Sequence, residues 1–266
     1  MISGVLYRRE MKNSLKMLVI FAAILSMYIS MIISMYDPEK ADVLKQFEQM
    51  MPELMAAVGM QNTSSTLIGF MSSYLYGMLL LVFPMVYTMM RANGLIAKYV
   101  DRGSMAVLVT GSVHRRTVVL TQTAVLCSGI FLLLLYCTAL EFAVAEMLFP
   151  GQLLLADLLR MNLGLLALQL FIGGLCFLCS CLFNDTRYSI GFGAGIPTFL
   201  YIVQMIANLG GNAENAKYFT FFTLYQPDAL TSGDSQAVLC AWILLAGAVL
   251  FFAASAVIFE KKDLPV

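Results

Sequence analysis

Six long apolar runs, separated by short polar segments, dominate the pattern of hydrophobic and polar positions along the 266-residue chain. They lie near 17–36, 67–90, 117–142, 158–183, 188–209 and 237–259. A helix needs about 20 apolar residues to cross the hydrocarbon core of a bilayer, and each run is about that long. The first run is too long for a signal peptide, and it lacks a small-residue cleavage site. We therefore predict an all-α membrane protein whose residues 1–266 form one transmembrane domain with six spans.

Lysine and arginine residues are unevenly divided between the two sets of connecting segments. One set holds Arg8, Arg9, Lys12, Lys16, Arg91, Lys98, Arg102, Arg115, Arg116, Arg187, Lys261 and Lys262. The other set holds only Lys40, Lys45, Arg160 and Lys217. Basic residues accumulate in the cytoplasmic loops of membrane proteins, so both termini and the segment between spans two and three are expected inside.

Two segments are expected on the outer side. Residues 37–65 carry a helical apolar stripe that Pro52 should split or kink. We expect an amphipathic helix resting on the outer membrane surface, and a partner-binding or gating element is the alternative. Residues 210–235 are rich in aromatic side chains, which favour the headgroup zone.

The inner segment 95–122 is half apolar although it lies between two spans. Gly103 is suited to end one helix because it adopts positive φ at little cost. Ser104 can cap a following short helix, in which Met105, Leu108 and Val109 recur at helical spacing. The pattern predicts a short cytoplasmic helix with one apolar face that docks on another protein.

This segment resembles the coupling region of type 2 ABC transporter permeases, the membrane subunits of ATP-driven exporters. The matching positions are Asp101, Gly103, Leu108, Val109, Arg115 and Arg116, followed by the apolar Val118, Val119 and Leu120. Four positions depart from the family pattern, namely Gly111, Ser112, His114 and Gln122. Residues 6–12 look like the family's amphipathic N-terminal helix, and 259–264 look like its basic C-terminal segment.

The resemblance implies a permease of a bacterial cell membrane that pairs with a second copy or a paralogue and with two copies of a separate ATP-binding subunit. The coupling helix would contact that subunit through Asp101, Arg102, Gly103, Met105, Leu108 and Val109. The segment between spans five and six would hold short re-entrant helices. Exporters of amphipathic peptides, phenol-soluble modulins among them, look similar in size and layout. The implied cargo is apolar or amphipathic, such as peptide toxins, antimicrobial peptides or lipophilic drugs.

Composition and missing motifs narrow the chemistry. Hydrophobic residues make up 60% of the chain and charged residues 12%, about half of the charged share of soluble domains. The net charge of zero argues against a nucleic-acid partner. No GxxxxGK[ST], GxSxG or HExxH motif occurs, so we expect no catalytic residue, cofactor or metal in this chain. ATP and Mg²⁺ would bind the partner ATPase.

Uncharged residues on spans one, two and five are the candidate translocation path, because the resemblance implies that these spans line the cavity between two permeases. The candidates are Met27, Met31, Tyr87, Gln204 and Asn208. Gly191 and Gly195 would allow close helix packing on span five. Glu141 and Arg160 lie near the outer ends of their spans, where they could face each other as a structural tie. An ion-coupled secondary transporter and a membrane scaffold without transport activity are the alternatives.

Overall fold

The computed structural model describes residues 2–36, 50, 52–59, 66–101, 103 and 114–262. Every regular element in this part of the chain is helical. Six helical segments are long and apolar enough to cross a membrane, which confirms the six predicted spans. They are α1 (Gly4–Met35), a composite second span, α8 (Arg115–Leu148), α9 (Leu155–Leu182), α10 (Thr186–Asn208) and α12 (Ser235–Lys261). The composite span consists of α4 (Leu67–Met71), η2 (Ser72–Leu79), α5 (Leu80–Leu95) and α6 (Ala97–Asp101).

The helices extend beyond the apolar runs at most ends. Helix α1 begins at Gly4 rather than near Met17, because the amphipathic N-terminal segment and the first span form one continuous helix. Its polar side chains Glu10 and Ser14 are buried. The first thirteen residues of α1 therefore pack on the bundle as its extension.

The second span changes its helical geometry along its length. Residues Ser72–Leu79 form a π-helix, and the N–H of Leu80 still donates to the carbonyl oxygen of Leu75, five residues earlier. Pro84 follows inside α5, where it removes a backbone donor from the next turn. A π-helical stretch adds a residue per turn and often lies at a functional site. Here it turns Ser72 and Tyr76 towards the interior of the bundle.

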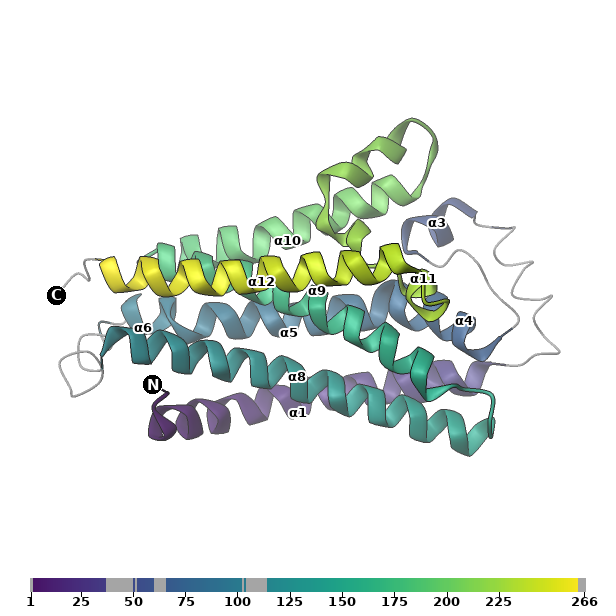
Figure 1. Cartoon of the computed structure of the whole chain (residues 1–266), viewed down its shortest axis with the longest axis horizontal. Helices are drawn as coiled ribbons and strands as arrows, with labels where there is room; N and C mark the ends of the chain where they lie inside the picture. The colour runs from purple at the N-terminus through teal and green to yellow at the C-terminus, as the bar shows by residue number, and fades with distance from the viewer. Residues whose placement is uncertain are drawn as a thin grey trace.

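Helix α9 lies at the centre of the bundle (Figure 1) and has the largest buried share of the six spans. Helices α5, α10 and α12 pack on α9, and α1 packs mainly on α8. Helix α5 also contacts both α1 and α10, so the face that these three helices form has α5 in its middle. Helices α1, α10 and α12 are the least buried, and their outer sides carry many exposed apolar side chains.

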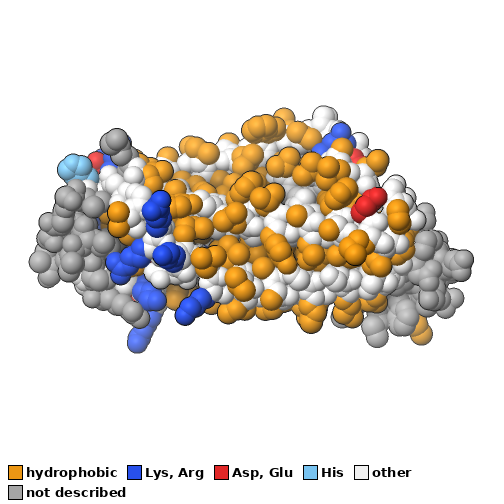
Figure 2. Space-filling view, turned by 90° about the horizontal axis from the view of Figure 1, so that it is seen from below, with side chains coloured by type: hydrophobic (Ala, Val, Ile, Leu, Met, Phe, Trp, Pro, Cys, Tyr) orange, Lys and Arg blue, Asp and Glu red, His pale blue; other side chains and the backbone are white. Residues whose placement is uncertain are grey.

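Both chain termini and α6 lie at one end of the bundle, which we call the basic end (Figure 1). Lys and Arg side chains gather at this end in Figure 2, while hydrophobic side chains cover the middle of the same face. Polar contacts tie the helix ends together here. Arg115 Nη1 donates to the carbonyl oxygen of Lys262 at 2.7 Å, and Lys262 Nζ donates to that of Cys181 at 2.8 Å. Arg116 forms an ion pair with Glu260 at 3.6 Å.

Short helices cover the opposite end. They are α3 (Pro52–Ala57), η3 (Gly211–Phe219), η4 (Phe221–Leu224) and α11 (Pro227–Thr231). Helix α3 is described from Pro52, and most of the predicted amphipathic segment 37–65 lies outside the described residues. Between α10 and α12, Tyr218 and Phe219 are exposed as expected of headgroup-zone aromatics. Phe222 and Tyr225 are buried, because η4 folds back against α10 and α12.

Candidate functional site

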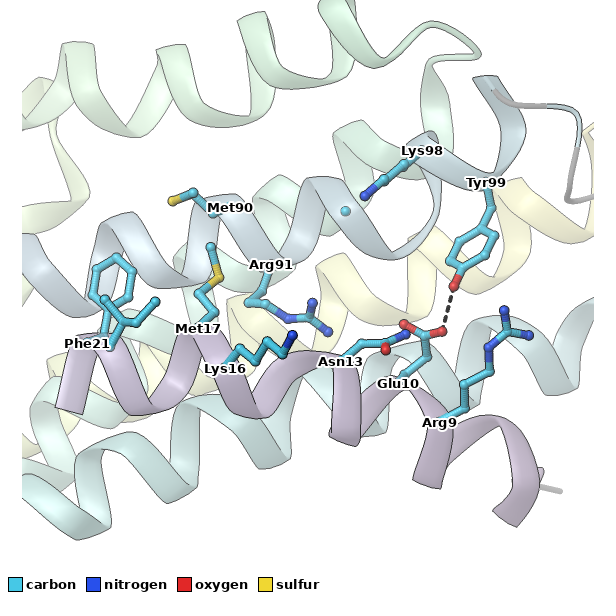
Figure 3. A pocket seen from close by; sticks show the side chains of 12 residues that line it. Arg9, Glu10, Asn13, Lys16, Met17, Phe21, Met90, Arg91, Lys98 and Tyr99 are labelled. Carbon is cyan, nitrogen blue, oxygen red and sulfur yellow. Dashed lines mark hydrogen bonds between the residues drawn. The ribbon is translucent and has the colours of Figure 1, made fainter. Parts of the chain in front are cut away.

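A groove of about 880 Å³ opens between α1 and the α5–α6 segment at the basic end (Figure 3). We call it the basic groove. Its rim carries four cationic side chains, Arg9 and Lys16 from α1, Arg91 from α5 and Lys98 from α6. Its floor is apolar and consists of Met17, Ile20, Phe21 and Met90. Charged groups thus surround an apolar surface, an arrangement that matches an amphipathic molecule.

Glu10, the acidic side chain that lines this groove, already accepts a hydrogen bond. Tyr99 Oη donates to Glu10 Oε1 at 2.6 Å, which ties α1 to α6 across the groove. Figure 3 shows Lys16 and Arg91 pointing into the same space from opposite sides. Within the described part of the chain, none of the four rim cations forms an ion pair, and the buried Nη2 of Arg91 has no hydrogen-bond partner. The groove therefore presents unmatched positive charge to any anionic group that enters it.

A second cavity of about 410 Å³ lies on the other side of α5, against α10. It shares Met90, Gly94 and Lys98 with the basic groove, so the two hollows adjoin across α5. Its remaining lining is mostly apolar and includes Ile190 and Ala194 of α10. The concave surface at the basic end therefore extends from α1 to α10, over the recessed α5.

A polar cavity of about 370 Å³ lies at the opposite end of the bundle, and we call it the polar chamber. Its walls come from η2, α3, α10, η4 and α11. The polar side chains that line it are Ser72, Tyr76, Tyr201, Gln204, Asn208, Thr223, Tyr225, Gln226 and Asp228.

Glu141 is fully buried directly behind one wall of this chamber. Tyr76 Oη donates to Glu141 Oε2 at 2.5 Å, and Asn162 Nδ2 donates to the same oxygen at 3.2 Å. The expected tie between Glu141 and Arg160 is wrong. Arg160 lies on the exposed side of α9 and pairs with Asp157 at 3.2 Å, because the two residues are one helical turn apart.

The five predicted path residues lie in three separate places. Met27 and Met31 are one turn apart on the exposed side of α1. Gln204 and Asn208 both line the polar chamber. Gln204 Nε2 donates to Asn208 Oδ1 at 2.8 Å, and Asn208 Nδ2 donates to the carbonyl oxygen of Ala57 at 3.4 Å. Tyr87 is buried in the core, where its ring packs edge-on against Phe21 and its hydroxyl abuts Gly129. Tyr87 lines none of the three cavities described above.

The predicted coupling residues fall mostly outside the described part of the chain. Arg102, Met105, Leu108 and Val109 are not described. Asp101 ends α6 and accepts a hydrogen bond from Thr186 Oγ1 at 2.9 Å, which joins α6 to the start of α10. Gly103 has φ of +68°, so the predicted left-handed conformation at this position is confirmed.

Sequence reasoning missed the partners that complete both sites. Arg91 was counted only for orientation, and Glu10 and Tyr99 were not singled out within the segments 6–12 and 95–122, although their hydrogen bond joins α1 to α6 across the groove. Asn162 was also missed, and the available signal was an amide within the apolar run 158–183, which holds only one other, Gln169. Gly191 and Gly195 have open space around them, whereas Gly193 packs between Asn93 and Cys179. Within one chain the close packing on α10 therefore occurs at Gly193.

Neither the protein-family models nor the curated proteins give a match to this chain. The function is therefore inferred from the six apolar helices and from the chemistry of the basic groove and the polar chamber.

Proposed function

We propose that this chain is the permease subunit of an ATP-driven exporter in a bacterial plasma membrane. It would pair with a second copy or a paralogue and bind two copies of a separate ATP-binding subunit. Its cargo would be an apolar or amphipathic molecule, such as a peptide or a lipophilic drug. This chain would form the path by which the cargo crosses the membrane, and the partner subunits would hydrolyse ATP.

The basic groove is the observation that carries this proposal. Its four rim cations suit the polar part of an amphipathic molecule, and its floor of Met17, Ile20, Phe21 and Met90 suits the apolar part. Methionine side chains are flexible and polarisable, so such a floor adapts to apolar groups of different shape. The groove also lies on the face of α1, α5 and α10, the three spans that the family resemblance assigns to the central path.

The outer sides of α1 and α10 leave room for a second permease beside this face. Met27 and Met31 on α1 are exposed, and so are Ile196, Phe199 and Ile202 on α10. Gly191 and Gly195 have no neighbour within contact distance, so another backbone could approach α10 closely there. A paired arrangement would convert the open surface between α1 and α10 into an enclosed path.

The coupling helix gives the direct test of ATP-driven function. We would purify the tagged chain with its native partners and measure ATP hydrolysis, together with ATP-dependent uptake of a fluorescent amphipathic peptide into inside-out vesicles. Leu108→Asp should leave membrane insertion intact and reduce stimulated hydrolysis and uptake together, since it places a charge in an apolar contact. Thr110→Asp, which puts the same charge on the opposite side of the predicted helix, is the matched control. Wild-type uptake by Leu108→Asp would reject the coupling role, and purified chain without any ATPase activity would reject the exporter.

Glu141 supports a second candidate, an ion-coupled secondary transporter. A buried carboxyl group within a membrane span usually marks an ion or proton pathway. Purified chain in proteoliposomes would then transport cargo in response to an imposed proton or sodium gradient, without nucleotide. Glu141→Gln would abolish that response. Gradient-independent, ATP-dependent uptake would favour the exporter, and absence of both activities would favour a scaffold.

A further inference from the structure

The polar chamber contains buried polar atoms that lack partners. Ser72 is 2% exposed and Tyr225 is 6% exposed; both residues line the chamber, and the buried hydroxyl group of each has no hydrogen bond to any described residue. The Tyr201 hydroxyl and Gln204 Oε1 lining the same space are also without one. Leaving a buried polar group unsatisfied costs about 1–3 kcal/mol, so four such atoms around one cavity indicate a polar occupant.

All four unmatched groups can accept a hydrogen bond. Gln204 Oε1 can only accept, whereas the three hydroxyl groups can also donate. Behind the chamber wall, Glu141 Oε1 and Asn162 Oδ1 are two further buried acceptors without partners. An occupant that brings several N–H donors would satisfy the whole set, whereas an anion would leave Gln204 Oε1 without a donor.

The charges around the chamber are negative. Asp228 lines it, and Glu141 is hydrogen-bonded to the lining residue Tyr76. Burial raises the pKa of the Tyr225 hydroxyl, and the neighbouring acids Glu141 and Asp228 raise it further, so both acids lie close enough to influence the chamber wall. No Lys or Arg is among the described residues that line the chamber. Among the described residues of the surrounding segments, Arg160 is paired with Asp157 and Lys217 with Glu214.

Aromatic rings complete the walls. Tyr201 of α10 and Phe222 of η4 meet edge-to-face with their centroids 5.4 Å apart, and Tyr76 and Tyr225 also line the chamber. The electron-rich faces of such rings attract an organic cation, and their apolar bodies accommodate a short alkyl chain.

We propose that the polar chamber binds a primary ammonium group carried on a short alkyl chain. The group's three N–H donors would satisfy the unmatched oxygens of Gln204, Tyr225 and Ser72, and Asp228 with Glu141 would balance its charge. A free alkylamine and the ammonium headgroup of a phosphatidylethanolamine share this chemistry. The inference goes beyond the proposed transport function and does not depend on it, because binding at this end requires no ATPase partner.

The test measures binding of radiolabelled ethanolamine to the purified full chain by equilibrium dialysis at pH 7, in an amine-free buffer and detergent. We expect saturable binding of one ethanolamine per chain. Choline, which lacks N–H donors, and neutral 1-propanol should compete at least roughly tenfold more weakly, the factor expected from losing a charge-assisted hydrogen bond. Equal competition by choline, or by Na⁺ at the same concentration, would overturn the proposal.

Variants separate a binding role from a structural one. Asp228→Asn should weaken ethanolamine binding roughly tenfold, and Asp157→Asn, which neutralises an acid outside the chamber at the same end, should not. Tyr225→Phe and Ser72→Ala remove unpartnered hydroxyl groups, so each should raise the unfolding temperature of the ligand-free protein while weakening ethanolamine binding. Undiminished binding by both of these variants, or an equal loss in Asp157→Asn, would contradict the site.

Nanodiscs distinguish the two sources of the ammonium group. If a lipid headgroup occupies the chamber, nanodiscs of phosphatidylethanolamine should block ethanolamine binding that nanodiscs of phosphatidylcholine permit. Equal binding in both lipids would identify the free amine as the ligand. Absence of saturable ethanolamine binding in phosphatidylcholine nanodiscs and in detergent alike would refute the proposal.

Discussion

At the scale of single residues, Glu141 shows how this bundle accommodates an acid inside a span. An unpaired buried carboxylate is costly, and a cation is the usual compensation. Here two neutral donors provide the compensation, the Tyr76 hydroxyl from the π-helix and the Asn162 amide from α9. Asn162 Nδ2 also lies 2.5 Å from Tyr76 Oη, so the three side chains hold η2, α8 and α9 in one register.

The first prediction concerns this network. Asn162→Leu should lower the free energy of unfolding by about 1–3 kcal/mol, because it leaves a buried carboxyl oxygen with one donor fewer. Asn13→Leu makes the same change at an exposed position of α1 and should stay within about 0.5 kcal/mol of the parent protein. Thermal unfolding in detergent, followed by tyrosine fluorescence, would compare the two. Equal stability of both variants would mean that the network contributes nothing to the fold.

At the scale of helices, the spans followed from sequence because each apolar run has the length of a bilayer crossing and ends at charged or polar residues. The π-helix Ser72–Leu79 could not be predicted in this way, because the sequence of its side chains is that of an ordinary apolar α-helix. Its long-range contacts are with α1 and α11, and Tyr76 also hydrogen-bonds to Glu141 of α8 and Asn162 of α9. The groove was missed for the same reason: residues 6–12 and 95–101 are far apart in sequence and meet only when α1 and α6 pack side by side. Of the predicted path residues, Met27 and Met31 are exposed whereas Tyr87 is buried, a difference that the sequence did not reveal because helical spacing alone does not tell which face of a span is buried.

The second prediction concerns the contact between η2 and the turn that follows α3. A Cβ on Gly77 would lie 3.0 Å from the carbonyl oxygen of Gly59, whose backbone has φ of +76°. Backbone atoms cannot rotate away, so Gly77→Ala should push α3 off the π-helix and destabilise the fold by about 1–3 kcal/mol. Gly94→Ala is the matched control, because open space surrounds that position in α5 and alanine favours helix. The unfolding temperatures of the two variants should move in opposite directions. A lower unfolding temperature in Gly94→Ala, or an unchanged one in Gly77→Ala, would contradict this packing.

At the scale of the whole molecule, the two ends of the bundle differ in charge and in cavity chemistry. The basic end carries the cationic groove, and the opposite end carries a chamber whose described lining has acids and neutral polar groups. The first asymmetry was predictable, because the division of lysine and arginine between loops is visible in the sequence. The second was not, since the chamber assembles from η2, α10 and α11 only after the chain has folded.

The third prediction assigns the two ends to the two sides of the membrane. In a background without the six native cysteines, Tyr218→Cys at the end opposite the basic end should react with a membrane-impermeant maleimide in intact cells. His114→Cys at the basic end should react only after the membrane is opened, because basic residues remain on the cytoplasmic side. Both positions are exposed in the structure, so a difference in labelling reports sidedness rather than burial. Labelling of His114→Cys in intact cells would reverse the proposed orientation.

The last prediction concerns the concave surface that extends from α1 to α10. Met90 lies where its two hollows adjoin and is 54% exposed, so Met90→Trp should fill the floor without disturbing the core. If cargo enters there, uptake of a bulky amphipathic peptide should fall several-fold while basal ATP hydrolysis by the assembled complex is retained. Met31→Trp, at an exposed methionine of α1 outside both hollows, should also reduce uptake, because α1 would border the path beside the proposed partner permease. Met147→Trp on α8 is the control, because that side chain is 83% exposed and lies outside both hollows. Normal uptake by both Met90→Trp and Met31→Trp in folded, partner-bound protein would mean that the path does not follow this face. An equally large loss of uptake in Met147→Trp would mean that the added bulk alone causes the effect.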